Sequence, residues 1–269
     1  MTINEIISTL DKIGVDNSRE EAYLIVEHVY EIPRSKILLD MQKSYTSPTI
    51  LEILEKRREH IPLQHIFGSW SFMGKEFYVS KDCLIPRPDT EILVERAIAL
   101  TKSGDKVADL CTGSGCIGIS LSLYCKNIDL TLVDISSGAL DMARKNASKH
   151  GVYARFILGD ITKDLPSEKF DIITSNPPYI PSDDINDLSP EVKKEPILAL
   201  DGGSDGLDII RFLVSNGLNY LNENGKMLIE FGYDQEAKIR ALLDGRHDFK
   251  SYEIVYDYGK NPRCVIIYK

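Results

Sequence analysis

The sequence predicts an α/β protein in which a mainly parallel β-sheet is covered by helices on both faces. From Lys106 onward, short apolar runs alternate with segments of helical periodicity, which is the order that parallel strands and crossover helices require. A glycine-rich turn at 111–118 follows the first of these apolar runs. The last two runs are joined by a short link that cannot form a parallel crossover, so the final strand should run antiparallel.

Short apolar runs bounded by turn residues indicate strands, and longer amphipathic stretches indicate helices. The expected strands span residues 107–110, 130–133, 154–158, 170–174, 226–231, 253–256 and 264–268. A helix should begin near Glu91, and further helices are expected at 116–124, 137–150, 207–221 and 235–243. This part of the chain is therefore expected to form one seven-stranded sheet.

The N-terminal part differs and predicts a small helical domain over residues 1–65. Thr2 and Ser18 are each followed three residues later by glutamate, which is the capping-box pattern of a helix start. Pro33 should end the second of these helices. Ser47 followed by Pro48 predicts another helix start, since proline is favoured at the first helical position.

Residues 66–84 form an expected connector between this domain and the sheet. Gly68 and Gly74 bracket a short aromatic-rich stretch, which is typical of a β-hairpin. The predicted division is therefore a helical domain at 1–65, a hairpin linker at 66–84 and a catalytic domain at 85–269.

The composition restricts the class of function. The 269 residues include 43% hydrophobic and 27% charged residues, and the net charge is −9. Proteins that bind nucleic acid mainly through its phosphates are usually basic, so stable nucleic-acid binding is not expected. The five cysteines form no C-x-x-C pair and no zinc-like spacing, so we expect no metal and reduced thiols in a cytoplasmic protein. Because the sequence contains no signal peptide and no long apolar span, no membrane association is expected.

The turn after the first strand predicts a nucleotide-type cofactor site. Gly113, Gly115 and Gly118 spell G-x-G-x-x-G, and Asp134 ends the next strand, where its carboxylate can accept both hydroxyls of a ribose. An NAD site fits this pattern as well. However, Asp109 precedes the turn, and a carboxylate there repels a pyrophosphate but attracts a sulfonium and an amino group.

The residues after the third strand also favour a cofactor with a sulfonium and an amino group over NAD. Gly159, Asp160 and Ile161 follow it and provide a polar edge and an apolar face for an adenine ring. We therefore expect S-adenosylmethionine as the cofactor. A turn used only for packing, and Asp160 as a plain loop acid, are the alternative interpretations.

The fourth strand ends in Asn176-Pro177-Pro178-Tyr179, next to the expected cofactor loop. An amide nitrogen is a poor nucleophile, so it must be oriented and its developing positive charge stabilised. The Asn176 side-chain oxygen and the Pro177 carbonyl can accept hydrogen bonds from an acceptor NH₂ group, and Tyr179 can cover a planar amide or base. We expect Asn176 and Pro177 to be catalytic, and all four residues, with Arg87, to contact the acceptor.

Taken together, these motifs resemble the release factor glutamine methyltransferases, or HemK-type enzymes, over nearly the whole chain. The resemblance is carried by residues 62–68, 84–91, 109–115, 133–134, 175–180, 195–200 and 202–208. The Asn-Pro-Pro-Tyr tetrad is less specific, because adenine and cytosine N-methyltransferases also contain it.

The resemblance implies a seven-stranded Rossmann-like class I methyltransferase fold. It implies methylation of the glutamine of the Gly-Gly-Gln loop in class 1 release factors, giving N5-methylglutamine, with the helical domain docking that partner. With the residues reasoned from above, the expected cofactor contacts are Asp109, Cys111, Thr112, Gly113, Ser114, Gly115, Asp134, Asp160, Ile161 and Asn176. The enzyme is expected to act as a monomer.

Two departures from the family pattern generate expectations of their own. Cys111 replaces a usual glycine, so the backbone there should be less contorted than in the family. The divergent segment 257–263 should lie away from the strand ends that contain the motifs. Two other functions stay open: methylation of an exocyclic amine of DNA or RNA bases, and a cofactor-binding adaptor or NAD-binding protein.

Overall fold

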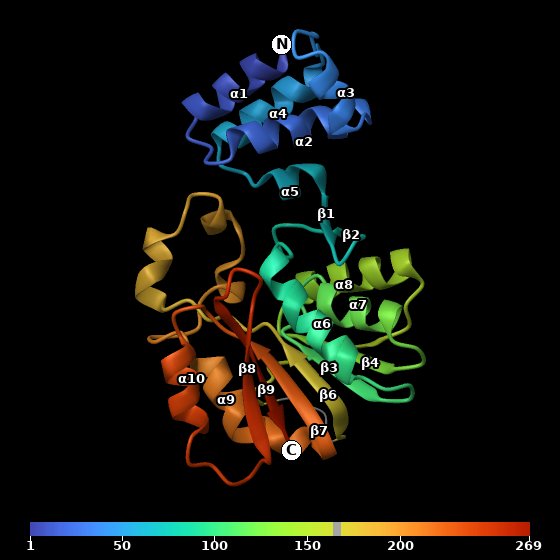
Figure 1. Cartoon of the computed structure of the whole chain (residues 1–269), viewed down its shortest axis with the longest axis vertical. Helices are drawn as coiled ribbons and strands as arrows, with labels where there is room; N and C mark the ends of the chain where they lie inside the picture. Colours follow the sequence, from blue (N-terminus) through green and yellow to red (C-terminus); the bar gives the residue numbers. More distant parts are fainter. Residues whose placement is uncertain (164–167) are drawn as a thin grey trace. The chain divides into compact units, whose positions relative to one another are not determined.

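A computed structural model describes residues 1–163 and 168–269 of the chain. The chain forms two compact units (Figure 1). The first comprises Met1–Gly68 together with Ser189–Lys194, and the second comprises Ser69–Leu188 and Glu195–Lys269. Each unit is described by itself.

The first unit is helical, as predicted. Its helices are α1 (Ile3–Lys12), α2 (Ser18–Tyr30), α3 (Arg34–Leu39), α4 (Pro48–Arg58) and α5 (Leu63–Phe67), with the short 3₁₀ helix η3 (Val192–Lys194). The apolar faces of α1, α2 and α4 form one core that includes Leu10, Val26 and Ile53. Two helices were not predicted: α3, which begins directly after Pro33, the residue expected to end α2, and α5, which begins directly after Pro62.

The helix starts follow the sequence at two of three places. Thr2 forms a complete capping box with Glu5, and the Ser47 hydroxyl accepts a hydrogen bond from the Thr49 amide, so both predictions are confirmed. The capping box predicted at Ser18 is wrong. Ser18 is the first residue of α2, and its hydroxyl donates to the Asp11 carboxylate instead.

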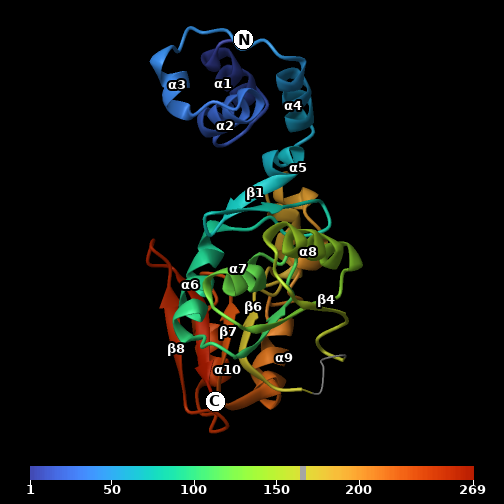
Figure 2. The ribbon, with the colours of Figure 1, turned by 90° about the vertical axis from the view of Figure 1, so that its right-hand side faces the viewer.

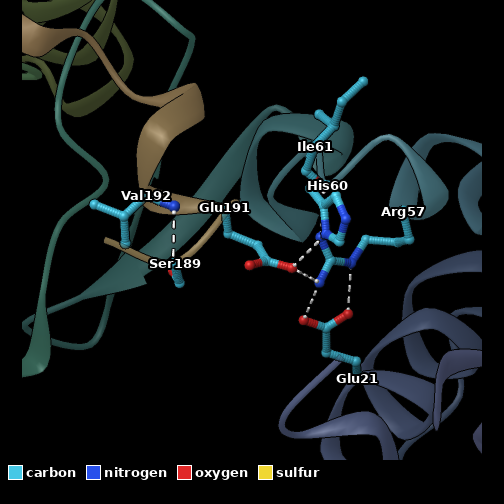
Figure 3. Close-up of polar contacts among 7 residues, drawn as sticks. All are labelled: Glu21, Arg57, His60, Ile61, Ser189, Glu191 and Val192. Atoms are coloured by element: carbon cyan, nitrogen blue, oxygen red, sulfur yellow. Dashed lines mark hydrogen bonds and ion pairs between the residues drawn. The ribbon is translucent and has the colours of Figure 1, made fainter. Parts of the chain in front are cut away.

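Arg57 of α4 is the largest fully buried side chain of the first unit, with 1% of its surface exposed. Its guanidinium makes two hydrogen bonds to Glu21 of α2, at 2.8 and 3.0 Å, and one to the Ile61 carbonyl at 2.7 Å. It also contacts Glu191 at 3.3 Å, and His60 faces the same carboxylate at 3.4 Å (Figure 3). The segment Ser189–Lys194 is thus joined to α2 and α4 through one buried cation.

Replacing Arg57 with alanine leaves the Glu21 and Glu191 carboxylates without their shared cation. Because both carboxylates are partly exposed, we expect a loss near the lower end of the range for broken buried pairs, about 3 kcal/mol in the free energy of unfolding. Denaturant titration measures this loss. The matched control is Arg58→Ala, whose side chain is 54% exposed and pairs with Glu55 on the same helix. It should cost under about 1 kcal/mol, and equal losses for the two variants would contradict this account.

The second unit contains a seven-stranded sheet in the order β5-β4-β3-β6-β7-β9-β8. Its strands are β3 (Lys106–Leu110), β4 (Asp129–Asp134), β5 (Arg155–Leu158), β6 (Phe170–Ser175), β7 (Leu221–Glu230), β8 (Ser251–Tyr256) and β9 (Pro262–Tyr268). The first five of these strands run parallel, and β9 runs antiparallel to both β7 and β8. The predicted fold class and the antiparallel final strand are confirmed.

Helices cover both faces of this sheet (Figures 1 and 2). They are α6 (Glu91–Leu100), α7 (Cys116–Tyr124), α8 (Ser137–His150), α9 (Asp208–Asn216) and α10 (Glu236–Leu243). Alternate strand residues enter two separate cores, one with α6, α7 and α8 and the other with α9 and α10. Among the residues described, no helix is long and apolar enough to span a bilayer.

Two neighbouring predicted boundaries in this unit are wrong, the end of one helix and the start of the strand that follows it. The helix expected at 207–221 ends at Asn216 and continues only as the 3₁₀ turn η5 (Gly217–Tyr220), and β7 begins already at Leu221. Gly217 approaches Met227 so closely that an added Cβ would lie 2.7 Å from its sulfur. The apolar residues after Asn216 therefore pack onto the sheet without extending the helix.

The aromatic hairpin is present as β1 (Ser69–Phe72) and β2 (Lys75–Tyr78), which pair antiparallel. Phe72 and Phe77 are buried in the core beneath α6, α7 and α8. The Asn146 side chain of α8 bonds the Tyr78 amide at 2.7 Å and its carbonyl at 2.9 Å. The hairpin is thus an integral part of the second unit.

Candidate functional site

The second unit has a pocket at the carboxyl ends of its parallel strands, where ligands of open α/β sheets bind. Ten of the residues singled out from the sequence line it: Arg87, Cys111, Thr112, Gly113, Ser114, Asp134, Asp160, Ile161, Asn176 and Pro178. Four others, Asp109, Gly115, Pro177 and Tyr179, lie outside the lining. The predicted cofactor and acceptor segments therefore meet at one cavity. Some residues of each segment lie behind the residues that line the cavity.

The loop between β3 and α7 turns sharply. Cys111 has φ of +56°, in the left-handed region, so the expectation of a less contorted backbone at this residue is wrong. Gly115 has φ of +81° and precedes α7. Gly118 lies where an added Cβ would come within 2.4 Å of Leu132 Cδ2, so this glycine allows α7 to pack against β4.

The strain at Cys111 predicts how substitutions there affect stability. A β-branched side chain tolerates positive φ poorly, so Cys111→Val should lower the free energy of unfolding by about 2 kcal/mol. Cys111→Gly should not lower it. Thermal unfolding measures both changes. The control is Cys125→Val, because Cys125 has φ of −105° and ψ of 133°, an extended conformation that valine favours. Equal losses at the two cysteines would show that the backbone at 111 is unstrained.

Asp109 is fully buried at the end of β3. Its carboxylate accepts hydrogen bonds from the Thr112 hydroxyl at 2.5 Å, the Gly118 amide at 3.1 Å and the Thr174 hydroxyl at 2.9 Å. Burial raises the pKa of Asp109 to about 6, against the effect of these three donors. This differs from the expected direct contact with a cofactor, because Asp109 is fully buried and lies outside the lining of the pocket.

Asp134, at the end of β4, does line the pocket. One oxygen accepts from the Gly113 amide at 2.8 Å and the other from the Ser136 amide at 2.9 Å. Burial raises the pKa of Asp134. A carboxylate has about four acceptor sites, so each oxygen can still accept from a ligand hydroxyl.

Asp160 and Ile161 follow β5 at the same cavity. A hydrogen bond from Lys163 lowers the pKa of Asp160 to about 2, and Thr162 also donates to this carboxylate. Ile161 is 5% exposed and packs into the core next to Val133. A polar edge and an apolar face therefore lie side by side, in the order that the sequence predicted.

Asn176 stands at the end of β6, and its amide has two different environments. Its Nδ2 donates to the Thr90 hydroxyl at 3.2 Å. Its Oδ1 is buried and finds no hydrogen-bond partner in the described part of the chain. A buried unpaired acceptor is costly, so this oxygen is available to a donor that enters the pocket.

Tyr179 is placed differently from the expected cover over the acceptor. Its hydroxyl donates to Glu230 of β7 at 3.5 Å, so the ring lies behind the pocket. Gln235 fixes the backbone of the same residue: its Nε2 donates to the Tyr179 carbonyl at 2.9 Å, and its Oε1 accepts from the Gly232 amide. Neither Glu230 nor Gln235 was selected from the sequence.

The glycine-rich run after the tetrad packs directly on it. The Ile180 amide donates to Leu200, and the Gly202 amide donates back to Ile180. A Cβ at Gly202 would lie 2.7 Å from the Pro178 carbonyl oxygen, so the close approach requires glycine. The segment 199–208 thus supports the acceptor loop.

Arg87 is held by another residue that we did not select. It pairs with Glu195, which is 4% exposed and also accepts from the Ile85 amide at 2.8 Å. Burial raises the pKa of Glu195, while Arg87 lowers it. The proline-rich run at 84–88 and the segment at 195–196 are therefore joined at the pocket wall.

The segment 257–263 lies beside the motif-bearing strand ends, so the expectation that it lies away from them is wrong. Arg263 is the second residue of β9 and is 8% exposed. It pairs with Asp89 at 3.0 Å and with Asp257 at 3.2 Å. Because β9 is antiparallel, its first residues return to the edge where β7 ends, with Cys264 opposite Glu230.

Thr90 and Glu230 share one signal that could have indicated them, whereas Glu195, which follows Lys193 and Lys194, has no such signal. Each of the first two is a polar residue at the end of an apolar or proline-rich run, as in Met227-Leu228-Ile229-Glu230. A polar side chain in such a place is buried and needs a partner. The partners, however, come from distant parts of the chain.

The fold and this strand-end pocket define a class I-type methyltransferase architecture. A solved methyltransferase from Pyrococcus furiosus superimposes with a TM-score of 0.55 at 17% identity, covering 74% of this chain and 91% of that one. The family model for the methyltransferase small domain matches residues 88–189, and that for the PrmC N-terminal domain matches residues 2–68.

Curated relatives narrow the class to one family. A release factor glutamine methyltransferase of Moorella thermoacetica is 33% identical over 99% of this chain and 97% of its own length. Another, of Geobacter sulfurreducens, is 36% identical over 86% of this chain and 82% of its own length. The chain belongs to the release factor glutamine methyltransferase family.

Proposed function

We propose that this protein transfers a methyl group from S-adenosylmethionine to the side-chain amide nitrogen of a glutamine in a class 1 peptide chain release factor. The observation that carries the proposal is the buried, unpartnered Oδ1 of Asn176 beside the pocket. Membership of the family supports the choice of acceptor. We assign docking of the release factor to the helical unit, which corresponds to the matched N-terminal domain.

The lining fits the cofactor in three respects. Asp134 retains acceptor capacity for two ribose hydroxyls, and Ile161 next to Asp160 suits an adenine ring. The Ser114 hydroxyl is buried without a hydrogen-bond partner among the described residues, and it lines the same cavity. When bound, S-adenosylmethionine supplies an electrophilic methyl group.

The acceptor side follows from the chemistry of an amide. Asn176 Oδ1 accepts a hydrogen bond from the glutamine NH₂ group and so fixes the orientation in which the amide nitrogen meets the methyl group. The same contact stabilises the positive charge that develops on nitrogen. Pro177 and Pro178 keep the loop rigid, so its acceptors are oriented before the substrate binds.

Cofactor choice can be measured by thermal stability. A ligand at 100 times its dissociation constant adds about 2.7 kcal/mol, so saturating S-adenosylmethionine should raise the melting temperature and NADH should not. Asp134→Ala should weaken the effect of S-adenosylmethionine, whereas Asp141→Ala, on the exposed face of α8, should leave it unchanged. Stabilisation by NADH alone would overturn the cofactor assignment.

Label transfer tests the acceptor. Methyl-labelled S-adenosylmethionine is offered with a class 1 release factor, with its Gln→Ala variant in the Gly-Gly-Gln loop, with duplex DNA and with ribosomal RNA. We expect label only on the intact release factor, since the net charge of −9 disfavours nucleic acid. Label on nucleic acid alone would replace the proposed acceptor with an exocyclic base amine.

The same assay tests Asn176. Asn176→Ala removes one preorganised acceptor and should cost about 2.7–4 kcal/mol in the transition state, or roughly 100- to 1,000-fold in turnover. The control is Asn216→Ala, because the Asn216 side chain bonds the Phe212 carbonyl within its own helix, α9. Near-normal turnover of the Asn176 variant would remove this residue from the mechanism.

A further inference from the structure

Asn146 is a buried polar residue of α8 that the proposed mechanism does not use. Its side chain is fully buried and lies outside the lining of the pocket. Two of its buried neighbours on this helix, Ala143 and Ala147, are alanines. Asparagine is a weaker helix former than alanine, and burying its carboxamide is costly unless the polar atoms have partners. The helix by itself therefore gives no reason for asparagine at this position.

The carboxamide of Asn146 has partners in two separate backbone segments. Its Oδ1 accepts from the Tyr78 amide at 2.7 Å. Its Nδ2 donates to the Tyr78 carbonyl at 2.9 Å and to the Ser114 carbonyl, also at 2.9 Å. An amide NH₂ group has two hydrogens, and both are used. Asn146 thus connects the end of β2 directly to the cofactor loop between β3 and α7.

The hairpin gives this connection a fixed base. Tyr78 pairs with Ser69 across the two strands of the hairpin. The last turn of α8 also contacts the hairpin, since the His150 ring nitrogen lies 3.0 Å from the Glu76 carbonyl oxygen. The Ser114 carbonyl is therefore bonded to a helix that is held against a paired hairpin.

The other end of the connection lies at the cofactor side of the pocket. The Ser114 hydroxyl lines the pocket and has no hydrogen-bond partner among the described residues. A Cβ at Gly115 would lie 3.1 Å from Ala143 Cβ, so the loop and α8 are in close contact here. Ala143 and Asn146 are three residues apart and share one face of the helix. The position of the Ser114 backbone therefore depends on this face of α8.

We propose that Asn146 is a positioning residue of the cofactor site, which holds the Ser114 backbone so that the cofactor loop keeps the conformation that binds S-adenosylmethionine. This inference rests on the proposed function of the same pocket. Making all three bonds requires one acceptor and two donors on a side chain of this length. Alanine offers none of them. Without them, the cofactor must order the loop as it binds, which weakens its affinity.

The first test compares Asn146→Ala with Ala147→Gly, a change at the next residue that weakens the helix but removes no side-chain hydrogen bond. Calorimetric titration with S-adenosylmethionine measures the dissociation constant. It should rise roughly 5- to 15-fold for Asn146→Ala, as expected for one lost hydrogen bond, and stay within about twofold for Ala147→Gly. Lower melting temperatures with equal dissociation constants in both variants would show a purely structural role and overturn the inference.

Turnover separates this role from that of the acceptor site. At saturating cofactor and release factor, turnover of Asn146→Ala should stay within about twofold, while its KM for S-adenosylmethionine rises. Asn176→Ala should behave in the opposite way, with a large loss of turnover and little change in cofactor affinity. A loss of turnover in Asn146→Ala at unchanged cofactor affinity would contradict the positioning role.

Hydrogen exchange measures the loop in the absence of cofactor. The amides of Thr112, Gly113 and Gly115 are hydrogen-bonded to Val133, Asp134 and Thr112, so they are protected while the loop is held in place. These three amides should exchange faster in Asn146→Ala than in the unaltered protein. Ala147→Gly should leave their rates unchanged, and equal rates in all three proteins would show that Asn146 does not hold the loop.

The unaltered protein decides the question if Asn146→Ala fails to fold. A ligand that requires the held loop reduces its opening, so saturating S-adenosylmethionine should slow exchange of the Tyr78 amide, which bonds Asn146. The control is the Lys250 amide, which bonds the Tyr268 carbonyl. No greater protection at Tyr78 than at Lys250 would overturn the inference.

The outcomes also separate this inference from the proposed function. If the unaltered protein labels the release factor and Asn146→Ala binds the cofactor as tightly as Ala147→Gly, the positioning role fails and the function stands. If the unaltered protein does not bind S-adenosylmethionine, the proposed function fails. The exchange rates of the loop amides without cofactor then decide the positioning role.

Discussion

Asp109 ends the central strand as a fully buried carboxylate, and it receives donors from three separate parts of the second unit. Thr112 belongs to the glycine loop, Gly118 to the first turn of α7 and Thr174 to β6. One carboxylate therefore connects the loop, the helix and the acceptor strand and fixes their relative positions, like a frame. The three hydrogen bonds offset the cost of removing the carboxylate from water. The pocket depends on this frame, because the glycine loop contributes to its cofactor side and the residues after β6 to its acceptor side.

The polar groups of the site differ in how far the protein itself satisfies them. Behind the pocket wall, Asp109 and Gln235 have their partners within the protein. Two groups in the lining, Ser114 Oγ and Asn176 Oδ1, are buried with none in the described residues. A protein that keeps such atoms unpaired pays in stability for contacts that form only with a ligand. The groups that already have hydrogen-bond partners hold the unpaired ones in place, and this is what preorganisation requires.

The fold was predictable because its signals are local. Strand and helix periodicity, the turn glycines and the short final link depend on neighbouring residues, and the sheet follows from them. The tetrad at 176–179 and Asp134 were found for the same reason, since each ends a recognisable strand. Partnerships such as Arg87 with Glu195, 108 residues apart, have no local signal.

Some errors came from assigning a role to a residue type without its partner. Asp109 was expected to face the cofactor, but nearby hydroxyls and an amide occupy it. Segment 257–263 was expected away from the motif-bearing strand ends, although an antiparallel last strand returns its start to the edge of the sheet where the parallel strands end. Ser18 fits a capping pattern, yet Asp11 of the preceding helix is the closer partner. In each case tertiary neighbours decided the outcome.

The short segment Ser189–Lys194 belongs to the helical unit, although the chain on both sides of it belongs to the sheet-containing unit. The backbone therefore passes between the two units three times, after residues 68, 188 and 194. A single cut cannot separate the protein into two complete modules, and a recombination event that exchanged only the first 68 residues would bring a foreign partner to Glu191. Arg57 and Glu191, which lie 134 positions apart, must consequently be inherited as a pair. The helical unit is therefore incomplete without the segment Ser189–Lys194 and cannot be exchanged as the first 68 residues alone.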